Sequence, residues 1–151
     1  MDYLELLVDY RKLLSRMAVV KQNIETLEAA STGNHAAFHT ARREGTFTDH
    51  TATLAAKRAN LSAELEQLEA QRTEQRKEIR TYIKYDPNPD LMKALFWRKV
   101  CRMPWAEVCK KLDNRHSCVA LRQAASRYIR KCENREADEC FEMGGIANEV
   151  W

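Results

Sequence analysis

Apolar residues in the first 27 positions of the chain follow one another at alternating intervals of three and four. An interval that averages about 3.5 residues places all of them on one stripe of an α-helix. Charged and amide side chains fill the positions between them, so the stripe is narrow and faces a partner helix. The pattern predicts a helix of roughly 43 Å over about residues 2–30. The members of the stripe are Tyr3, Leu6, Tyr10, Leu13, Met17, Val20, Ile24 and Leu27.

A second long helix is predicted over about residues 50–85, where apolar residues recur with the same period. Arg58, Arg72 and Gln75 interrupt this second stripe, and polar residues at such positions can fix the register and the number of chains. The residues of the second stripe are Leu54, Leu61, Leu65, Leu68, Ile79 and Tyr82.

The segment between the two helices, residues 31–50, is predicted to be a loop. It opens with Ser31, Thr32, Gly33 and Asn34, which are residue types that end helices, and it holds two of the four glycines. The two helices are therefore expected to fold back on each other as an antiparallel hairpin, a coiled coil, over residues 1–85.

Two helices alone bury little apolar surface, so the hairpin is expected to assemble with further copies into a homo-oligomer, a dimer or a tetramer. The side chains predicted to hold that oligomer together are Leu6, Tyr10, Leu13, Met17, Val20, Ile24, Leu27, Leu61, Leu65 and Leu68.

Composition excludes several fold classes. Only 4 Gly and 3 Pro occur, while charged residues make up 31% of the chain. So few turn residues exclude a many-stranded sandwich or barrel, and the chain has no glycine-rich nucleotide-binding loop. Apolar runs are too short for a membrane span and no signal peptide is recognised, so we expect an all-α cytoplasmic protein that does not enter a membrane.

Two prolines, Pro87 and Pro89, end the second helix, with Asn88 between them as the predicted N-cap of a third. Residues 86–133 are predicted to form a three-helix module, with helices over about 89–102, 104–112 and 116–131 and a tight turn at 113–115. Residues 134–151 form an acidic tail that frays or folds back. The predicted core of the module is Leu91, Met92, Leu95, Phe96, Val100, Trp105, Val108, Cys109, Leu112, Val119, Ala125, Tyr128 and Ile129.

Charge is unevenly distributed along the chain. The net charge is +1 over residues 1–85, +6 over residues 86–133 and −4 over residues 134–151. A short helix, a tight turn and a longer basic helix are typical of a helix-turn-helix, whose last helix enters the major groove of DNA. Arginine can recognise guanine and glutamine can recognise adenine there, while other cations contact phosphates. The predicted base-reading residues are Arg115, His116, Ser117, Arg122, Gln123, Arg127 and Arg130, and the predicted phosphate contacts are Arg98, Lys99, Arg102, Lys110 and Lys111.

The run from Phe96 to Leu112, FWRKVCRMPWAEVCKKL, resembles the start of a sigma-70 region 4-type helix-turn-helix. Pro104-Trp105 and Glu107-Val108-Cys109 take the places of characteristic residues of that motif, and Val119 and Arg122 match its recognition helix. Phage late-gene activators of the ArpU/RinA type carry this module after a helical N-terminal region. The resemblance covers about 40 residues. It implies a transcriptional regulator that binds promoter DNA in a bacterial host cell and also contacts RNA polymerase.

Two other functions remain open at the level of sequence. A small terminase subunit for DNA packaging also joins a helix-turn-helix to a helical hairpin, usually in the opposite order, and forms rings. A coiled-coil adaptor would instead bind protein, with the three-helix module as a basic docking surface. A solution mass of a dimer or tetramer would favour the regulator, whereas eight or more chains would favour packaging.

All five cysteines lie in the last third of the chain, and none is spaced as CxxC. We expect small buried side chains on helix faces and no disulfide framework. A zinc site of Cys101, Cys109, Cys118 and His116 is the alternative, although its spacing matches no usual ligand pattern. His35 and His39 are expected to be exposed loop residues. No catalytic constellation stands out, so neither an enzyme nor a cofactor is expected.

Overall fold

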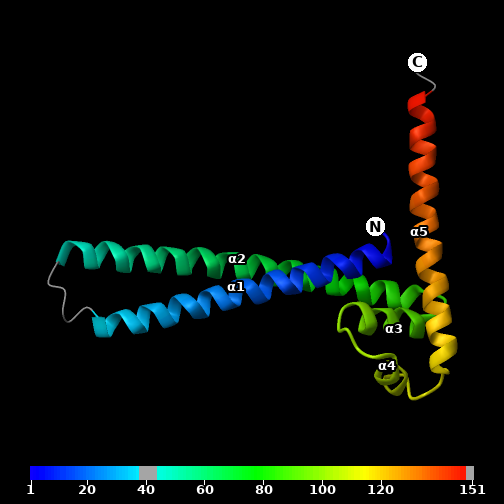
Figure 1. Ribbon diagram of the computed structural model, residues 1–151, viewed down its shortest axis with the longest axis horizontal. Helices are drawn as coiled ribbons and strands as arrows, with labels where there is room; N and C mark the ends of the chain where they lie inside the picture. The colour runs from blue at the N-terminus through cyan, green and yellow to red at the C-terminus, as the bar shows by residue number, and fades with distance from the viewer. Residues whose placement is uncertain (38–43, 149–151) are drawn as a thin grey trace. The chain divides into compact units, whose positions relative to one another are not determined.

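The computed structural model describes the backbone of residues 1–37 and 44–148 and the side chains of residues 1–31 and 50–137. This part of the chain contains α-helices and no strand, which confirms the all-α prediction. None of the described helices is both long and apolar enough to cross a membrane. The helices are α1 Tyr3–Ala37, α2 Glu44–Tyr85, α3 Pro89–Lys99, α4 Trp105–Lys111 and α5 Cys118–Asn148 (Figure 1).

The predicted loop at residues 31–50 is wrong over most of its length. Helix α1 continues through Gly33 to Ala37, and α2 already begins at Glu44. A glycine inside a helix costs only about 1 kcal/mol, and without a proline nothing blocks the hydrogen bonds of a long helix. His39 lies outside the described residues, as does the side chain of His35.

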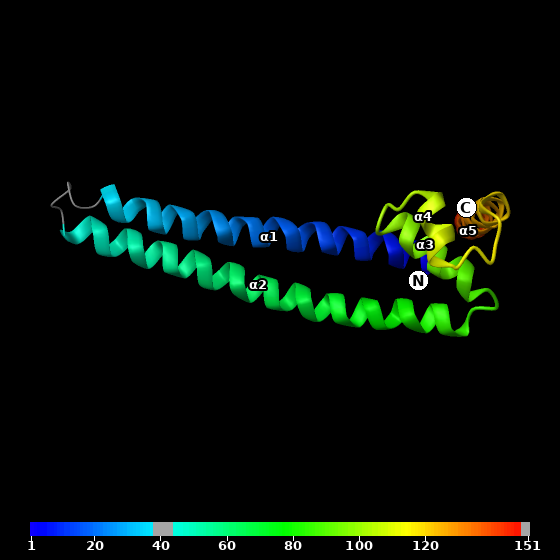
Figure 2. The ribbon, with the colours of Figure 1, turned by 90° about the horizontal axis from the view of Figure 1, so that it is seen from below.

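The chain divides into two compact units, and the first is Lys12–Arg76. In this hairpin unit α1 and α2 run antiparallel (Figure 2). Arg16 pairs with Glu64 at 2.9 Å, and Glu28, farther along α1, pairs with Arg58, which is earlier in α2. The core contains the buried residues Leu13, Met17, Val20 and Leu68, with Ile24, Leu61 and Leu65 packed against them.

Polar residues within the second stripe have different surroundings. Arg58 is exposed and bonded to Glu28, so it does not enter the core. Gln75 is half-buried, and its Oε1 atom has no hydrogen-bond partner in the described part of the chain. The hairpin unit therefore holds a thin apolar stripe that polar groups interrupt.

The second unit, the C-terminal unit, combines residues 1–11 with residues 77–151. Tyr3, in the first turn of α1, is fully buried, and its hydroxyl donates a 2.9 Å hydrogen bond to the carbonyl of Met92 in α3. The Tyr3 ring also lies 5.4 Å from the ring of Tyr82 in α2, and the Tyr10 ring lies 6.1 Å from that of Phe96. The ends of both long helices, assigned to the hairpin from the sequence, thus complete the core beneath α3, α4 and α5.

Local signals position the short helices of the C-terminal unit. The Asn88 side chain accepts a hydrogen bond from the Leu91 amide at 3.2 Å and Pro89 opens α3, as predicted. The helix ends at Lys99, earlier than expected, and Arg102 follows with a φ of 53°. That left-handed conformation costs a non-glycine residue about 1–3 kcal/mol.

The turn between α4 and α5 is a Schellman motif. The Asn114 amide donates to the Cys109 carbonyl and the Asp113 amide to the Lys110 carbonyl, each at 3.0 Å. Asp113 and Asn114 have φ values of 55° and 52°, which their short polar side chains tolerate better than most. Ser117 then caps α5, accepting the Ala120 amide at 3.1 Å. Two residues other than glycine therefore make the turn.

The predicted end of the last helix near residue 131 is wrong. Helix α5 continues through the acidic segment to Asn148 and extends beyond α3 and α4 (Figure 1). Glutamate, arginine and alanine in this segment favour a helix. Even Gly144 and Gly145 remain helical. The side chains of Phe141, Met143 and Ile146 lie outside the described residues, as do Val150 and Trp151 entirely.

Candidate nucleic-acid interface

One side of α5 packs into the C-terminal unit. Leu121, Ala125 and Cys132 are buried there, and Tyr128 and Ile129 are half-buried. Val119 was predicted to be a core residue, but it is 65% exposed, so that prediction is wrong. The error has a geometric cause. The buried stripe of α5 begins at Leu121, and Val119, two residues earlier, points to the other side of the helix. The interval of four between Leu121 and Ala125 was the available signal.

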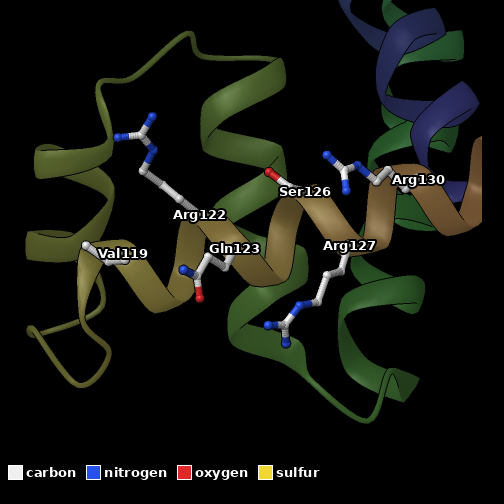
Figure 3. Close-up of a pocket in the computed structure, with 6 residues that line it drawn as sticks. All are labelled: Val119, Arg122, Gln123, Ser126, Arg127 and Arg130. Carbon is white, nitrogen blue, oxygen red and sulfur yellow. The ribbon is translucent and has the colours of Figure 1, made fainter.

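The opposite side of α5 is an exposed basic face. Its members recur at intervals of three and four, which places them on one side of the helix. They line a shallow hollow of about 410 Å³. In the view of this face in Figure 3, Arg122 and Ser126 point toward one edge of the face, and Gln123 and Arg127 point toward the opposite edge. We define the basic face as Val119, Arg122, Gln123, Ser126, Arg127 and Arg130.

The basic face carries three positive charges without compensation. Arg122, Arg127 and Arg130 form no ion pair with any carboxylate in the described part of the chain. Ser126, which the sequence prediction omitted, lies between them. An uncompensated row of arginines and neutral hydrogen-bonding side chains can bind an anion or the polar edges of bases.

The predicted base-reading residues before α5 have partners within the chain. His116 Nε2 lies 2.9 Å from Asp90 Oδ2, and Arg115 Nη2 lies 3.8 Å from Asp90 Oδ1. The Arg115 Nε group also donates to the Leu112 carbonyl at 3.1 Å. The hydrogen bond from His116, followed by the charge of Arg115, holds the pKa of Asp90 below its ordinary value of 3.8. These residues, with Ser117 as the cap, tie the start of α5 to α3.

The predicted phosphate contacts fall into two groups. Arg98 donates to the Met103 carbonyl at 3.0 Å and lies over the Trp105 ring, while Lys111 Nζ lies 5.3 Å from the centre of the Trp97 ring. These cation–π contacts leave both charges at the surface. Lys99, Arg102 and Lys110 are exposed and extend the positive charge beyond α5.

The expectation of free buried thiols is wrong for Cys109 and Cys118, because Cys109 in α4 is paired with Cys118 at the start of α5. The sequence interval of nine gives no such signal, and the tight turn brings the two Cα atoms to 6.0 Å. The alternative zinc site also fails: Cys101 is exposed and unpaired, and no group of three potential ligands occurs among the described residues. Burial is the main cause that raises the pKa of the Cys132 thiol to about 11.

The residues predicted to hold an oligomer together already pack within one chain. Leu6 and Tyr10 are buried in the C-terminal unit, and Leu13, Met17, Val20 and Leu68 are buried in the hairpin unit. Four residues keep part of their surface exposed, and two of them line a shallow hollow with Asn23, Thr26, Lys57 and Asn60. Those four residues are Ile24, Leu27, Leu61 and Leu65.

Comparison of the chain with protein-family models, with characterised proteins and with solved structures finds no match.

Proposed function

We propose that this chain is a sequence-specific DNA-binding transcriptional regulator that acts as a homo-oligomer on promoter DNA. The basic face of α5 is the single observation that carries the proposal. It combines a glutamine, a serine and three arginines that form no ion pair among the described residues, all on the exposed side of a helix whose other side is buried.

The dimensions of a helix suit this role. An α-helix with its side chains is about 10–12 Å across, close to the roughly 12 Å width of the major groove of DNA. Arg122 and Arg127 can donate two hydrogen bonds to a guanine, and Gln123 can pair with the N6 and N7 atoms of adenine. Lys99, Arg102 and Lys110 supply the phosphate contacts that fix the orientation.

The neighbouring elements support a helix-turn-helix. Helix α4 has seven residues, and the Schellman turn ends it a few residues before α5 begins. The bonds of Asp90 to His116 and Arg115 hold the residues just before α5 against α3. Such fixed positioning is required for base recognition, because a helix that moved freely would lose register with the bases.

Self-association is the second component of the proposal. Ile24, Leu27, Leu61 and Leu65 leave apolar surface partly exposed on the hairpin unit, and burying it against another copy is favourable. A symmetric dimer would present two α5 helices to half-sites about one helical turn apart. Contact with RNA polymerase, which the resemblance implies, belongs to the same proposal.

The proposal is tested by titrating duplex DNA into the full-length protein at several salt concentrations. We expect affinity that falls as salt rises, since bound cations displace counterions from DNA. The double variant Arg122→Ala/Arg127→Ala should bind its preferred duplex at least tenfold more weakly and should discriminate less between DNA sequences, because both side chains are assigned to bases. The matched control is Arg76→Ala/Arg80→Ala, which removes two exposed arginines from α2 and should bind as the wild type does.

Two results would contradict the proposal. Absence of salt-dependent affinity for any duplex would remove DNA binding altogether. Equal loss in the α5 and α2 double variants would show that general charge, and not the basic face, governs binding.

A further inference from the structure

Val119 is an apolar residue on a face that is otherwise basic and polar. It occupies the second position of α5, and about two-thirds of its surface is exposed. The neighbouring core is completed by Leu121 and Ala125, so Val119 is not required to fill it. A β-branched residue is also not favoured by helix propensity at this place. Neither packing nor local structure explains a valine here.

We propose that Val119 contacts the C5-methyl group of a thymine in the major groove and makes the chain prefer thymine at that position. The inference rests on the proposed function and deepens it by naming one element of the DNA sequence. The thymine methyl is the one apolar group that base pairs display in the major groove. Residues in the first turn of a recognition helix are those that reach base edges.

The arrangement of the basic face limits where that thymine lies. Gln123 is one turn further along α5, about 6 Å along the helix axis, which is close to two base steps of about 3.4 Å. The Gln123 amide suits adenine. We therefore expect each half-site to contain a thymine that meets Val119 and an adenine within about two base pairs of it.

A protein partner is a weaker explanation of the exposed valine. Protein contact surfaces expose contiguous apolar patches, whereas Val119 is followed on its face by Arg122, Gln123 and Ser126. A single valine among arginines matches a DNA edge, where one methyl group is surrounded by hydrogen-bonding atoms and phosphates.

The experiment begins by selecting duplexes from a pool with a random core, using the full-length protein. Thymines of the selected duplex are then replaced by uracil, which lacks only the C5-methyl group. One position of the half-site is changed at a time, and the same position is changed in both half-sites. We expect one position at which uracil weakens wild-type binding about tenfold to twentyfold, because the change removes one buried methyl group, an effect of about threefold to fivefold, from each of the two half-sites.

Two variants assign that effect to its residue. Val119→Ser removes both methyl groups and should bind the thymine and uracil duplexes equally, while Val119→Thr keeps one methyl group and should retain a preference for thymine. Val19→Ser is the matched control, because Val19 is 56% exposed on the hairpin unit, and it should discriminate as the wild type does. Since Val119 is exposed, its replacement should leave the melting temperature within a few degrees of the wild type.

The outcomes separate the inference from the proposed function. If wild-type binding is indifferent to every uracil, or if Val119→Ser keeps the same discrimination, the thymine contact is overturned while DNA binding stands. If no duplex is enriched from the pool, both the contact and the proposed function fall.

Discussion

The hairpin unit and the C-terminal unit are both made of amphipathic helices, but their cores differ in depth. The seven largest side chains with almost no exposed surface all belong to the C-terminal unit. The hairpin unit buries four residues, and three others pack against them with part of their surface exposed. Those seven side chains of the C-terminal unit are Tyr3, Leu6, Leu7, Met92, Leu95, Val108 and Leu112.

The difference shows how much core an apolar stripe with intervals of three and four residues can form. Two helices that meet along one stripe bury only one side of each, however long they are. In the C-terminal unit α3, α4 and α5 pack on one another and on the ends of α1 and α2, so buried residues are covered from several directions. The deeper core gives α5 a fixed support, which recognition of a specific surface requires.

The largest expected effect tests this difference in depth with two leucines. Leu95→Ala in the C-terminal unit should lower the free energy of unfolding by about 3 kcal/mol, because it leaves a cavity in a closed core. Leu65→Ala in the hairpin unit should cost about 1 kcal/mol, since Leu65 is half-buried and its site can collapse. Chemical denaturation followed by circular dichroism measures both, and equal losses would show that the cores do not differ.

An intermediate effect concerns the disulfide of the C-terminal unit. Reducing the Cys109–Cys118 bond should lower the free energy of unfolding by about 2.5 kcal/mol, the chain-entropy value for a loop of nine residues. Trp97 and Trp105 lie in the C-terminal unit, so their fluorescence should report the change.

The control for the disulfide is Cys101→Ser, which alters an exposed unpaired thiol and should leave unfolding unchanged. Thiol titration of the denatured protein should find two more thiols after reduction than before. An unchanged number of thiols would show that the disulfide does not form and that it does not stabilise the C-terminal unit.

The smallest expected effect concerns the contacts of Asp90 in α3 with Arg115 and His116, just before α5. The folded-state pKa of Asp90 is lowered, so its carboxylate stabilises the fold above its ordinary pKa of 3.8, and this contribution is lost as pH falls through the folded-state pKa. Asp90→Asn should therefore cost less than about 1 kcal/mol at pH 7, since its partners are largely exposed, and nothing at pH values below that pKa.

Denaturation of both proteins from neutral to acidic pH measures this difference. A loss that stayed constant across the range would mean that Asp90 acts through its shape or its helix position and not through its charge. DNA affinity in the same variant would then report whether the tie positions the basic face.

Much of the architecture follows from local patterns in the sequence. The heptad stripe predicts α1 and most of α2, Asn88 and Pro89 predict the start of α3, and the interval from Arg122 to Arg130 predicts an exposed arginine row. These signals depend on a few neighbouring residues. The disulfide, the burial of Tyr3 against Met92 and the bonds of Asp90 are tertiary contacts, and an apolar or charged residue does not reveal which partner it will meet.

The errors at Val119 and in the acidic segment have separate physical causes. Val119 is apolar and lies close in sequence to the buried stripe of α5, so the sequence pattern places it in the core. A shift of one or two positions along a helix, however, turns a side chain from the core to the surface. Negative charge and two glycines predict a tail that is not part of the helix, yet α5 continues through both to Asn148. Negative charge alone does not disfavour a helix.

The C-terminal unit is built from segments that are far apart in the sequence, and this affects its synthesis. Tyr3 and Met92 bond across 89 residues. Because a ribosome releases the chain from its N-terminus, Leu6 and Leu7 leave the exit tunnel long before α3 exists to cover them. The hairpin unit, complete by residue 76, can pair its helices before α3 is synthesised, because all of its contacts lie within residues that have already left the ribosome.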